Sequence, residues 1–124
     1  KMFKTSIIIS DKTQELIQDK NFLSRKLDRV SVVGRNEPMG IFEIFDYQEE
    51  TIKDAKLKTL DCFENSVEIY ERGDWSEASH GFKECLKHFP EDSAASIYIG
   101  RCDMMINNPE VAIGWDGITH MKNK

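Results

Sequence analysis

Apolar residues in the first third of the chain follow the two-residue period of β-strands. Residues 6–9 contain a β-branched run that predicts a buried strand. Residues 24–33 and 39–45 predict two further strands, and the second of these alternates regularly between two sets of side chains. Because the turn-forming residues 34–38 lie between these two strands, we expect an antiparallel hairpin.

Two local features modify this pattern. Asp11 followed by Gln14 has the D-x-x-Q form of a helix N-cap with a reciprocal partner, which predicts a short helix through Ile17. Asn21 is expected to end that helix. Leu27 is out of phase with the strict alternation of the strand that contains it.

From Thr51 onward the period of the apolar residues changes from 2 to 3.6, which predicts helices. The first helix runs to Gly73, the second ends before Pro90, and the third extends through Met105. The expected N-caps are Asp74 or Ser76 for the second helix and Asp92 or Ser93 for the third.

The strands and the short helix are not a complete domain, because they leave sheet edges exposed and enclose little core. They need the rest of a sheet, a dimer partner or the downstream helices. We therefore expect an α+β fold, with a short β-hairpin plus a strand and a helix, followed by an α-helical hairpin. The expected parts are residues 1–47, a linker or helix entry over 48–58, and a helical segment over 59–124 that closes in a docking tail.

The composition argues against a nucleic-acid-binding, membrane-spanning or secreted chain. The chain has 124 residues, of which 40% are hydrophobic and 31% charged, and its net charge of −5 argues against a nucleic-acid partner. No run approaches the roughly 18 apolar residues that cross a bilayer, and no secretory leader opens the chain. We expect a cytoplasmic location, no membrane contact from this segment, and a fragment of a longer protein, which could itself be membrane-anchored.

The cysteines and histidines do not predict a metal site. Cys62, Cys85 and Cys102 are odd in number and widely spaced, which favours reduced thiols. Cys85 and His88 have a metal-like spacing, but they lie on a predicted amphipathic helix without the further ligands that structural zinc needs. No Ser, His, Asp or Cys arrangement supports a nucleophile, so we expect no catalytic residue and no metal ligand.

Residues 70–90 resemble the turn and second helix of a tetratricopeptide repeat (TPR), a 34-residue helical hairpin. Gly73 would supply the tight turn, Ala78 would let the first helix approach, and Phe82 would fill the gap between the helices. Cys85 is small where the family usually has alanine. The positions that carry this packing are Ser66, Tyr70, Gly73, Ala78, Phe82, Cys85, Pro90 and Gly100.

The repeat spacing continues beyond the first hairpin. Ser66 is small where the first helix requires it, and adding 34 residues gives Gly100, again small. The third helix would then open a second repeat whose second helix is not evident. Such a module binds and scaffolds without chemistry, and its groove would take a protein or peptide partner. A helical bundle with accidental spacing is the alternative.

A face of acidic residues lies on the first predicted helix. Glu64, Glu68 and Glu71 are spaced to line one side of it. A solvated face is the default interpretation, and a basic peptide is the alternative occupant.

Residues 25–44, RKLDRVSVVGRNEPMGIFEI, resemble the last two strands of the class III adenylate/guanylate cyclase catalytic domain. That family ends in a phrase like R-x-L-D-x-V-x-V-K-G-[KR]-x-x-P-V-x-I-Y-E-V. The preceding residues 7–13 match the family's strand and helix just before it, so the match covers roughly residues 5–45. Bacterial members often carry helical repeats after the cyclase domain, which fits the second half of this chain.

The resemblance implies a parent enzyme that converts ATP or GTP to a cyclic nucleotide and pyrophosphate, using two Mg²⁺ or Mn²⁺ ions held by two aspartates. Those aspartates lie upstream in the family pattern, so no cofactor is expected in this segment. A lysine of the V-K-G turn contacts nucleotide phosphates in the family, but Val33 stands there. Arg35 could contact a phosphate instead, with a solvated turn residue as the alternative.

Two hypotheses follow for function. The first is the C-terminal portion of a cyclase, non-catalytic in itself, with a TPR-like segment that regulates or dimerises; class III cyclases act as dimers, so a homodimer is expected. The second is a stand-alone TPR-like module for protein–protein interaction.

Overall fold

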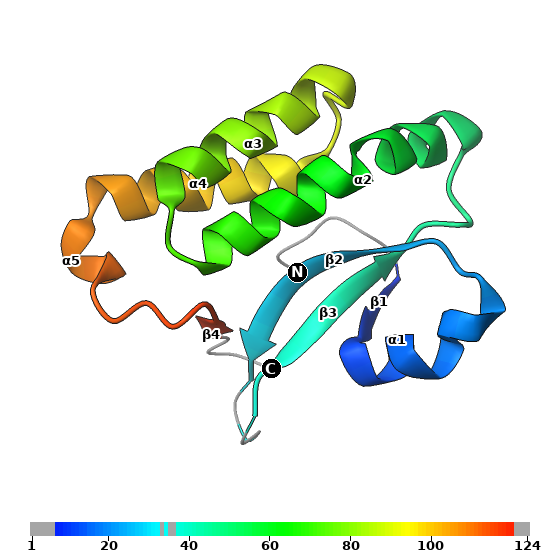
Figure 1. The fold of residues 1–124 in the computed structure, drawn as a ribbon, viewed down its shortest axis with the longest axis horizontal. Coiled ribbons are helices and arrows are strands. Elements are labelled where there is room, and N and C mark those ends of the chain that lie inside the picture. The colour runs from blue at the N-terminus through cyan, green and yellow to red at the C-terminus, as the bar shows by residue number, and fades with distance from the viewer. Residues whose placement is uncertain (1–6, 33, 35–36, 121–124) are drawn as a thin grey trace.

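The computed structural model describes residues 7–32, 34 and 37–120, and these form the expected α+β fold (Figure 1). The N-terminal elements are β1 (Ile8–Ser10), α1 (Asp11–Ile17), a 3₁₀ turn (Gln18–Lys20), β2 (Ser24–Ser31) and β3 (Met39–Ile44). The C-terminal elements are α2 (Glu50–Glu71), α3 (Trp75–His88), α4 (Ser93–Asn107), α5 (Pro109–Ala112) and β4 (Thr119–His120).

The strands form one sheet in the order β1-β3-β2-β4. The predicted β2–β3 hairpin is confirmed, and β1 pairs antiparallel with the other side of β3. A β-bulge between Lys26 and Asp28 accounts for the phase of Leu27, because an extra residue there lets both Leu27 and Val30 be buried. β4 was not predicted; it pairs parallel with the end of β2 through Val30 and Ser31.

The cap of the first helix lies one residue earlier than predicted. Ser10 caps α1, because its Oγ accepts the backbone N–H of Thr13 at 3.2 Å. Asp11 is the first residue of α1, and its Oδ2 accepts the N–H of Gly40 on β3 at 3.1 Å instead. The predicted stop is confirmed, since Asn21 lies in the left-handed region with φ 61°.

α2 begins at Glu50, so the stretch expected as a linker or helix entry supplies its first turns. Gly73 follows α2 with φ 87°, the left-handed conformation that ends a helix and allows the tight turn into α3. Of the two expected N-caps for α4, Asp92 takes the role, and its Oδ1 accepts the N–H of Ala95 at 3.4 Å.

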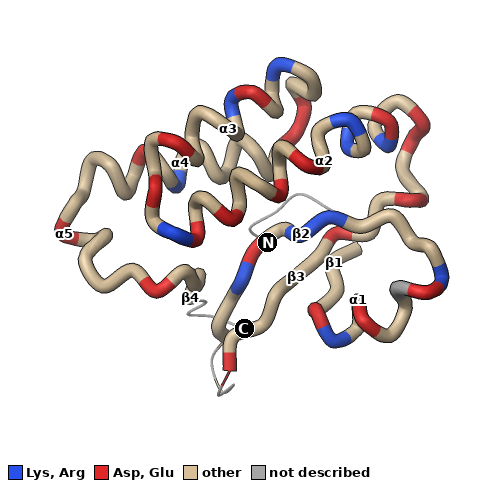
Figure 2. Tube along the Cα trace, viewed as in Figure 1, with Lys and Arg blue, Asp and Glu red and all other residues tan. Residues whose placement is uncertain are grey.

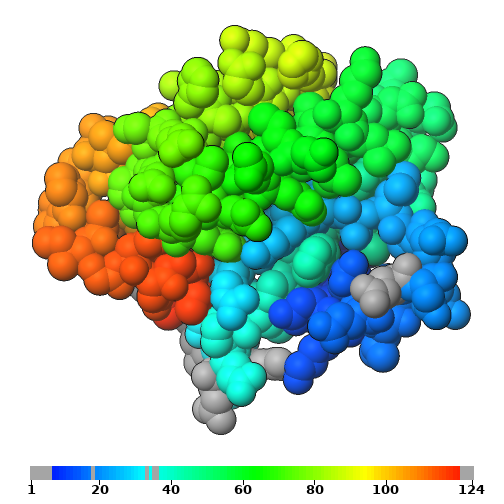
Figure 3. All heavy atoms as spheres, in the orientation of Figure 1, coloured from blue at the N-terminus to red at the C-terminus, as the bar shows by residue number. Residues whose placement is uncertain are grey.

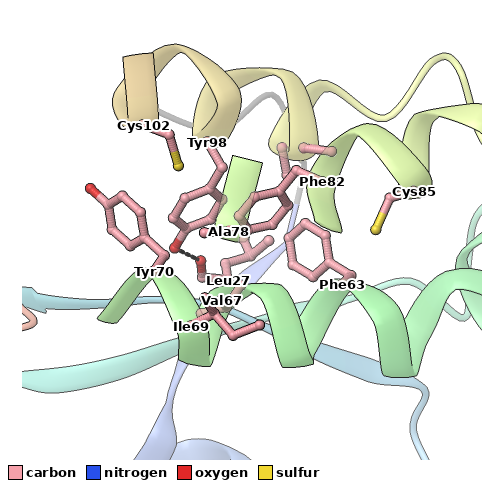
Figure 4. Close-up of a cluster of buried hydrophobic side chains, with 12 residues drawn as sticks. Leu27, Phe63, Val67, Ile69, Tyr70, Ala78, Phe82, Cys85, Tyr98 and Cys102 are labelled. Carbon is pink, nitrogen blue, oxygen red and sulfur yellow. Dashed lines mark hydrogen bonds between the residues drawn. The ribbon is translucent and has the colours of Figure 1, made fainter. Parts of the chain in front are cut away.

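Helices α2, α3 and α4 lie together as a layer over one side of the sheet, with α2 nearest to β2 (Figure 1). Their shared core contains Phe63, Phe82 and Tyr98, whose rings contact one another (Figure 4). Leu27 is the buried residue that β2 contributes to this cluster. Because one core includes residues from the sheet and from all three helices, the two halves of the chain form one folded unit.

The closest approach of α2 and α3 is at Ser66 and Gly81. A Cβ added to Gly81 would lie 2.1 Å from Ser66 Oγ and 3.2 Å from Ser66 Cβ. The small residue of α3 that this crossing requires is therefore Gly81, which the sequence analysis did not single out. Ala78, expected in that role, is fully buried in the aromatic core.

The C-terminal tail folds back over the helices. Trp115 donates its indole N–H to the carbonyl oxygen of Glu71 at 2.9 Å, and its ring contacts those of Tyr70 and Trp75. Gly117 lies close to the same carbonyl, where an added Cβ would be only 3.1 Å away. Figure 3 shows the orange-red tail packed beside the end of α2 and β2. The segment predicted as a docking tail thus contacts the end of α2, and it begins with the short α5.

Among residues 7–32, 34 and 37–120, no helix is both long enough and apolar enough to cross a membrane.

Replacing Gly81 with alanine tests the helix crossing. We expect Gly81→Ala to lower the free energy of unfolding by about 1–2 kcal/mol, because the added methyl group collides with Ser66 in a packed interface. Gly100→Ala is the matched control, since nothing lies within 4 Å of an added Cβ there, and helix propensity predicts a gain of up to about 1 kcal/mol. Urea unfolding of both variants distinguishes the two; equal effects would contradict the close approach.

Candidate functional site

The most heavily buried polar side chains lie between the sheet and the helical layer. Arg25 on β2 is 1% exposed, and its Nε donates to Glu43 Oε1 on β3 at 2.8 Å. Its Nη1 and Nη2 donate to the two carboxylate oxygens of Asp92, each at 2.9 Å, which is the bidentate geometry that suits a guanidinium. The guanidinium also lies over the ring of Phe63 at 4.1 Å from its centroid. One side chain thus connects two strands, α2 and the start of α4.

Lys56 of α2 completes this network. Its Nζ lies 2.5 Å from Glu43 Oε2 and donates to Gln48 Oε1 at 2.8 Å. Two cations and two carboxylates therefore neutralise one another in a space from which water is largely excluded. We call Arg25, Glu43, Lys56 and Asp92 the ionic junction.

The electrostatics of the ionic junction differ for its two cations. Burial opposes the charge on Arg25, but the hydrogen bonds and charges of Asp92 and Glu43 together outweigh it and raise the pKa of Arg25 above its ordinary value. For Lys56, loss of hydration dominates over the attraction of Glu43 and lowers its pKa. The guanidinium is therefore the fixed positive charge of the ionic junction.

A second set of contacts holds the length of β2 against α2 and α4. The hydroxyl of Tyr98 donates to the carbonyl oxygen of Leu27, and Arg101 Nη1 lies 2.9 Å from Asp28 Oδ2. On the α2 side, Glu64 Oε2 accepts the backbone N–H of Lys26 at 2.7 Å, and the Lys26 ammonium pairs with Glu71 at 3.2 Å. Figure 2 shows the basic positions of β2 beside acidic positions of α2.

These contacts decide what covers the inner faces of α2 and α4. β2 of the same chain lies along both helices and bonds to side chains of each. Glu64 and Glu71, expected on a solvated face or beside a basic peptide, are bonded to Lys26 instead, whereas Glu68 is exposed. A peptide could therefore not occupy this face without displacing β2.

The predicted packing positions gather in the helical layer. Ser66, Tyr70, Ala78, Phe82 and Cys85 are all buried there. Pro90 and Gly100 are exposed. Arg35, predicted to contact phosphate, and Val33 beside it lie outside the described residues.

Sequence reasoning assigned no role to the members of the ionic junction except Asp92, which it expected as a cap. A signal was present in the phase of the charges. Glu43 is two residues from both Ile41 and Phe45, so it lies on the same face of the strand as these apolar residues. Lys56 lies one helical turn before Leu60, on the apolar side of α2. A charged residue in the phase of buried neighbours indicates a buried ion pair.

The ionic junction holds the sheet and the helices together, and the space beside it is small. The hollow beside it measures about 140 Å³ and is lined in part by Gln48, Ile52 and Phe89. Binding sites for drug-sized ligands measure about 300–1,000 Å³, so this hollow does not fit a nucleotide. Within the described ranges, no three His, Cys, Asp or Glu side chains are grouped so that they could hold a metal ion.

Comparison with known proteins connects the chain to one enzyme class. It is 32% identical over 113 residues to "Adenylate cyclase, terminal-differentiation specific" of Dictyostelium discoideum, a match that covers 90% of this chain. The chain spans about 5% of the length of that relative. No family model matches the chain, and no solved structure matches it. The similarity supports a relationship to an adenylate cyclase.

Removing one charge tests the ionic junction. We expect Asp92→Asn to lower the free energy of unfolding by about 3 kcal/mol, because it keeps a capping oxygen for α4 but leaves Arg25 short of a buried counter-charge. Glu84→Gln breaks an exposed pair with Lys87 and serves as the control, with no measurable change expected. Urea unfolding measures both. An Asp92→Asn protein as stable as the parent would contradict a role for this charge.

The aromatic cluster predicts a loss of stability at high pH. Burial raises the pKa of Tyr70 to about 12. Since this exceeds the value of about 10 in an unfolded chain, the contribution of neutral Tyr70 is complete below pH 10 and is lost as pH rises toward 12. Tyr70→Phe should therefore reduce the decline in unfolding free energy between these pH values, as followed by urea unfolding at several pH values. An unchanged decline would contradict the assignment.

Proposed function

We propose that this chain is the C-terminal portion of a class III nucleotide cyclase catalytic domain joined to a TPR-like helical hairpin, and that the hairpin is a rigid, non-catalytic element which supports and regulates the cyclase. The observation that carries this proposal is the ionic junction. It joins Arg25 and Glu43, which belong to the cyclase-like phrase, to Lys56 and Asp92, which belong to the helices.

The extent of the similarity supports the same proposal. A match over 90% of the chain must include both the strands and the helical layer. The two parts therefore occur together in a protein named as an adenylate cyclase, which argues against a chance resemblance of the hairpin alone. The chain spans about 5% of that relative, so the cyclase activity and its nucleotide substrate are proposed for the longer protein that contains this chain.

The TPR-like assignment is supported by a spacing of 34 residues. α3 begins at Trp75 and α5 begins at Pro109, a difference of 34, and Asp74 and Asn108 are the corresponding N-caps. Ser66 meets Gly81 at the crossing of α2 and α3. In the second repeat the counterpart of Ser66 is Gly100, which remains uncovered because α5 ends after four residues. We infer one full repeat and an incomplete second one.

The alternative, a stand-alone module that binds a peptide between its helices, has less support. The faces of α2 and α4 that would form the groove already hold β2. In the proposal favoured here, β2 is the internal occupant of that groove, and nucleotide and metal ions bind elsewhere in the longer cyclase.

A cyclase that carries this segment provides the test. We expect Asp92→Asn within it to lower kcat for cyclic nucleotide formation at least about fivefold, which corresponds to about 1 kcal/mol, with KM for the nucleoside triphosphate little changed. The reason is that a loosened hairpin no longer holds the end of the catalytic sheet. The assay belongs at a temperature where circular dichroism shows the variant to be folded, with Glu84→Gln as the control.

Two results would contradict the proposal. If a folded Asp92→Asn enzyme kept full cyclase activity, the helical hairpin would have no influence on catalysis. Cyclic nucleotide production by the isolated 124 residues with Mg²⁺ or Mn²⁺ would contradict the non-catalytic assignment.

A further inference from the structure

Two thiols meet where α2 and α3 pack together. Cys62 Sγ on α2 lies 3.4 Å from Cys85 Sγ on α3, and Cys62 also lies 3.4 Å from the carbonyl oxygen of Gly81. Figure 4 shows the sulfur of Cys85 pointing from α3 toward α2. The crossing at Ser66 and Gly81 is what brings the two helices close enough for this contact.

The separation of the two sulfurs is compatible with a covalent bond. A disulfide is about 2.05 Å long, so the two sulfurs must approach each other by roughly 1.3 Å to form one. The third cysteine, Cys102, is buried on α4 and makes no sulfur contact among the described residues.

The two thiols differ in access to solvent. Cys62 is half-buried and lines a surface hollow of about 400 Å³ together with Asp61, Asn65 and Glu68. Cys85 is fully buried behind it. Burial, reinforced by the contact with Cys62, raises the pKa of the Cys85 thiol well above its ordinary value. A small oxidant therefore reaches Cys62 first, and Cys85 is placed to react second.

We propose that Cys62 and Cys85 form a modification site at which a peroxide converts the two thiols into an intramolecular disulfide that joins α2 to α3. Cys62, as thiolate, attacks one oxygen of hydrogen peroxide, which breaks the O–O bond and leaves a sulfenic acid and hydroxide. Cys85 then attacks the Cys62 sulfur, forms the S–S bond and releases the sulfenic oxygen as water after proton transfer. In total, two thiols and one peroxide give one disulfide and two waters.

This modification would stabilise the helical layer. The bond closes a loop from residue 62 to residue 85 that includes the turn at Gly73, and so restricts the unfolded chain. It would also prevent α2 and α3 from separating at their crossing. The inference does not depend on the proposed cyclase function, since it rests on the geometry of the two helices alone.

Treatment of the purified 124-residue chain with hydrogen peroxide tests the site. After unfolding in denaturant, we expect alkylation with N-ethylmaleimide to label three cysteines in the untreated protein and only Cys102 in the treated protein. A Cys62–Cys85 cross-linked peptide should appear in the mass spectrum of the treated protein. Tm should rise by about 5–10 °C and return to its starting value with dithiothreitol.

The variants separate this site from general oxidation. Cys62→Ser and Cys85→Ala should abolish both the cross-link and the rise in Tm, whereas Cys102→Ala should retain both. The proposal is overturned if the treated parent protein still has three alkylable thiols, or if its disulfides join separate chains. It is also overturned if the stabilisation survives in Cys62→Ser.

Discussion

Arg25 carries a charge that a folded protein cannot discharge, because a guanidinium remains protonated at every accessible pH. With its side chain 1% exposed, that charge requires carboxylates at fixed positions. One comes from the neighbouring strand and the other from Asp92, the residue that caps α4, 67 positions later in the chain. The requirement places the start of α4 over β2, and the positions of α3 and the tail follow because both pack on the helices so placed. A buried ion pair of this kind adds little net stability, but it specifies one arrangement of the two halves.

The consequence for domain organisation is that the boundary suggested by sequence is not a structural boundary. The change of period near Thr51 is real, yet α2 begins at Glu50 and packs directly on β2. The incomplete strand layer obtains its missing cover from the helices, one of the three solutions that its exposed edges required. The helices in turn receive Leu27 as a core residue and β2 as the occupant of their inner faces. Neither half buries its apolar surface alone, so we expect them to fold together.

Features set by local chemistry were predictable from sequence, and features set by distant contacts were not. Strand alternation, the stop at Asn21 and the turn at Gly73 depend on neighbouring residues and were predicted correctly. The cap of α4 was narrowed to Asp92 or Ser93, and Asp92 takes the role. Ser10 replaced Asp11 as the first cap because Asp11 bonds to β3, a contact 29 residues away. Gly81 was missed for the same reason, since only the packed pair of helices reveals which small residue lies at the crossing. Glu43 and Lys56 of the ionic junction fall at sequence positions where buried residues are expected, which indicates a buried ion pair. Which residues pair with them becomes clear only in the folded structure.

The outer edge of β2 has a consequence for how this protein associates with itself. A free strand edge presents amide and carbonyl groups that another chain can join, which is a common start of aggregation. Here Glu64 accepts the amide of Lys26, Tyr98 donates to the carbonyl of Leu27, and β4 pairs with the last residues of β2. Side chains from two helices and a short strand thus form the hydrogen bonds with β2 that a neighbouring full-length strand would otherwise form. Another chain therefore cannot add a strand to β2 along the stretch from Lys26 to Ser31 that these contacts occupy.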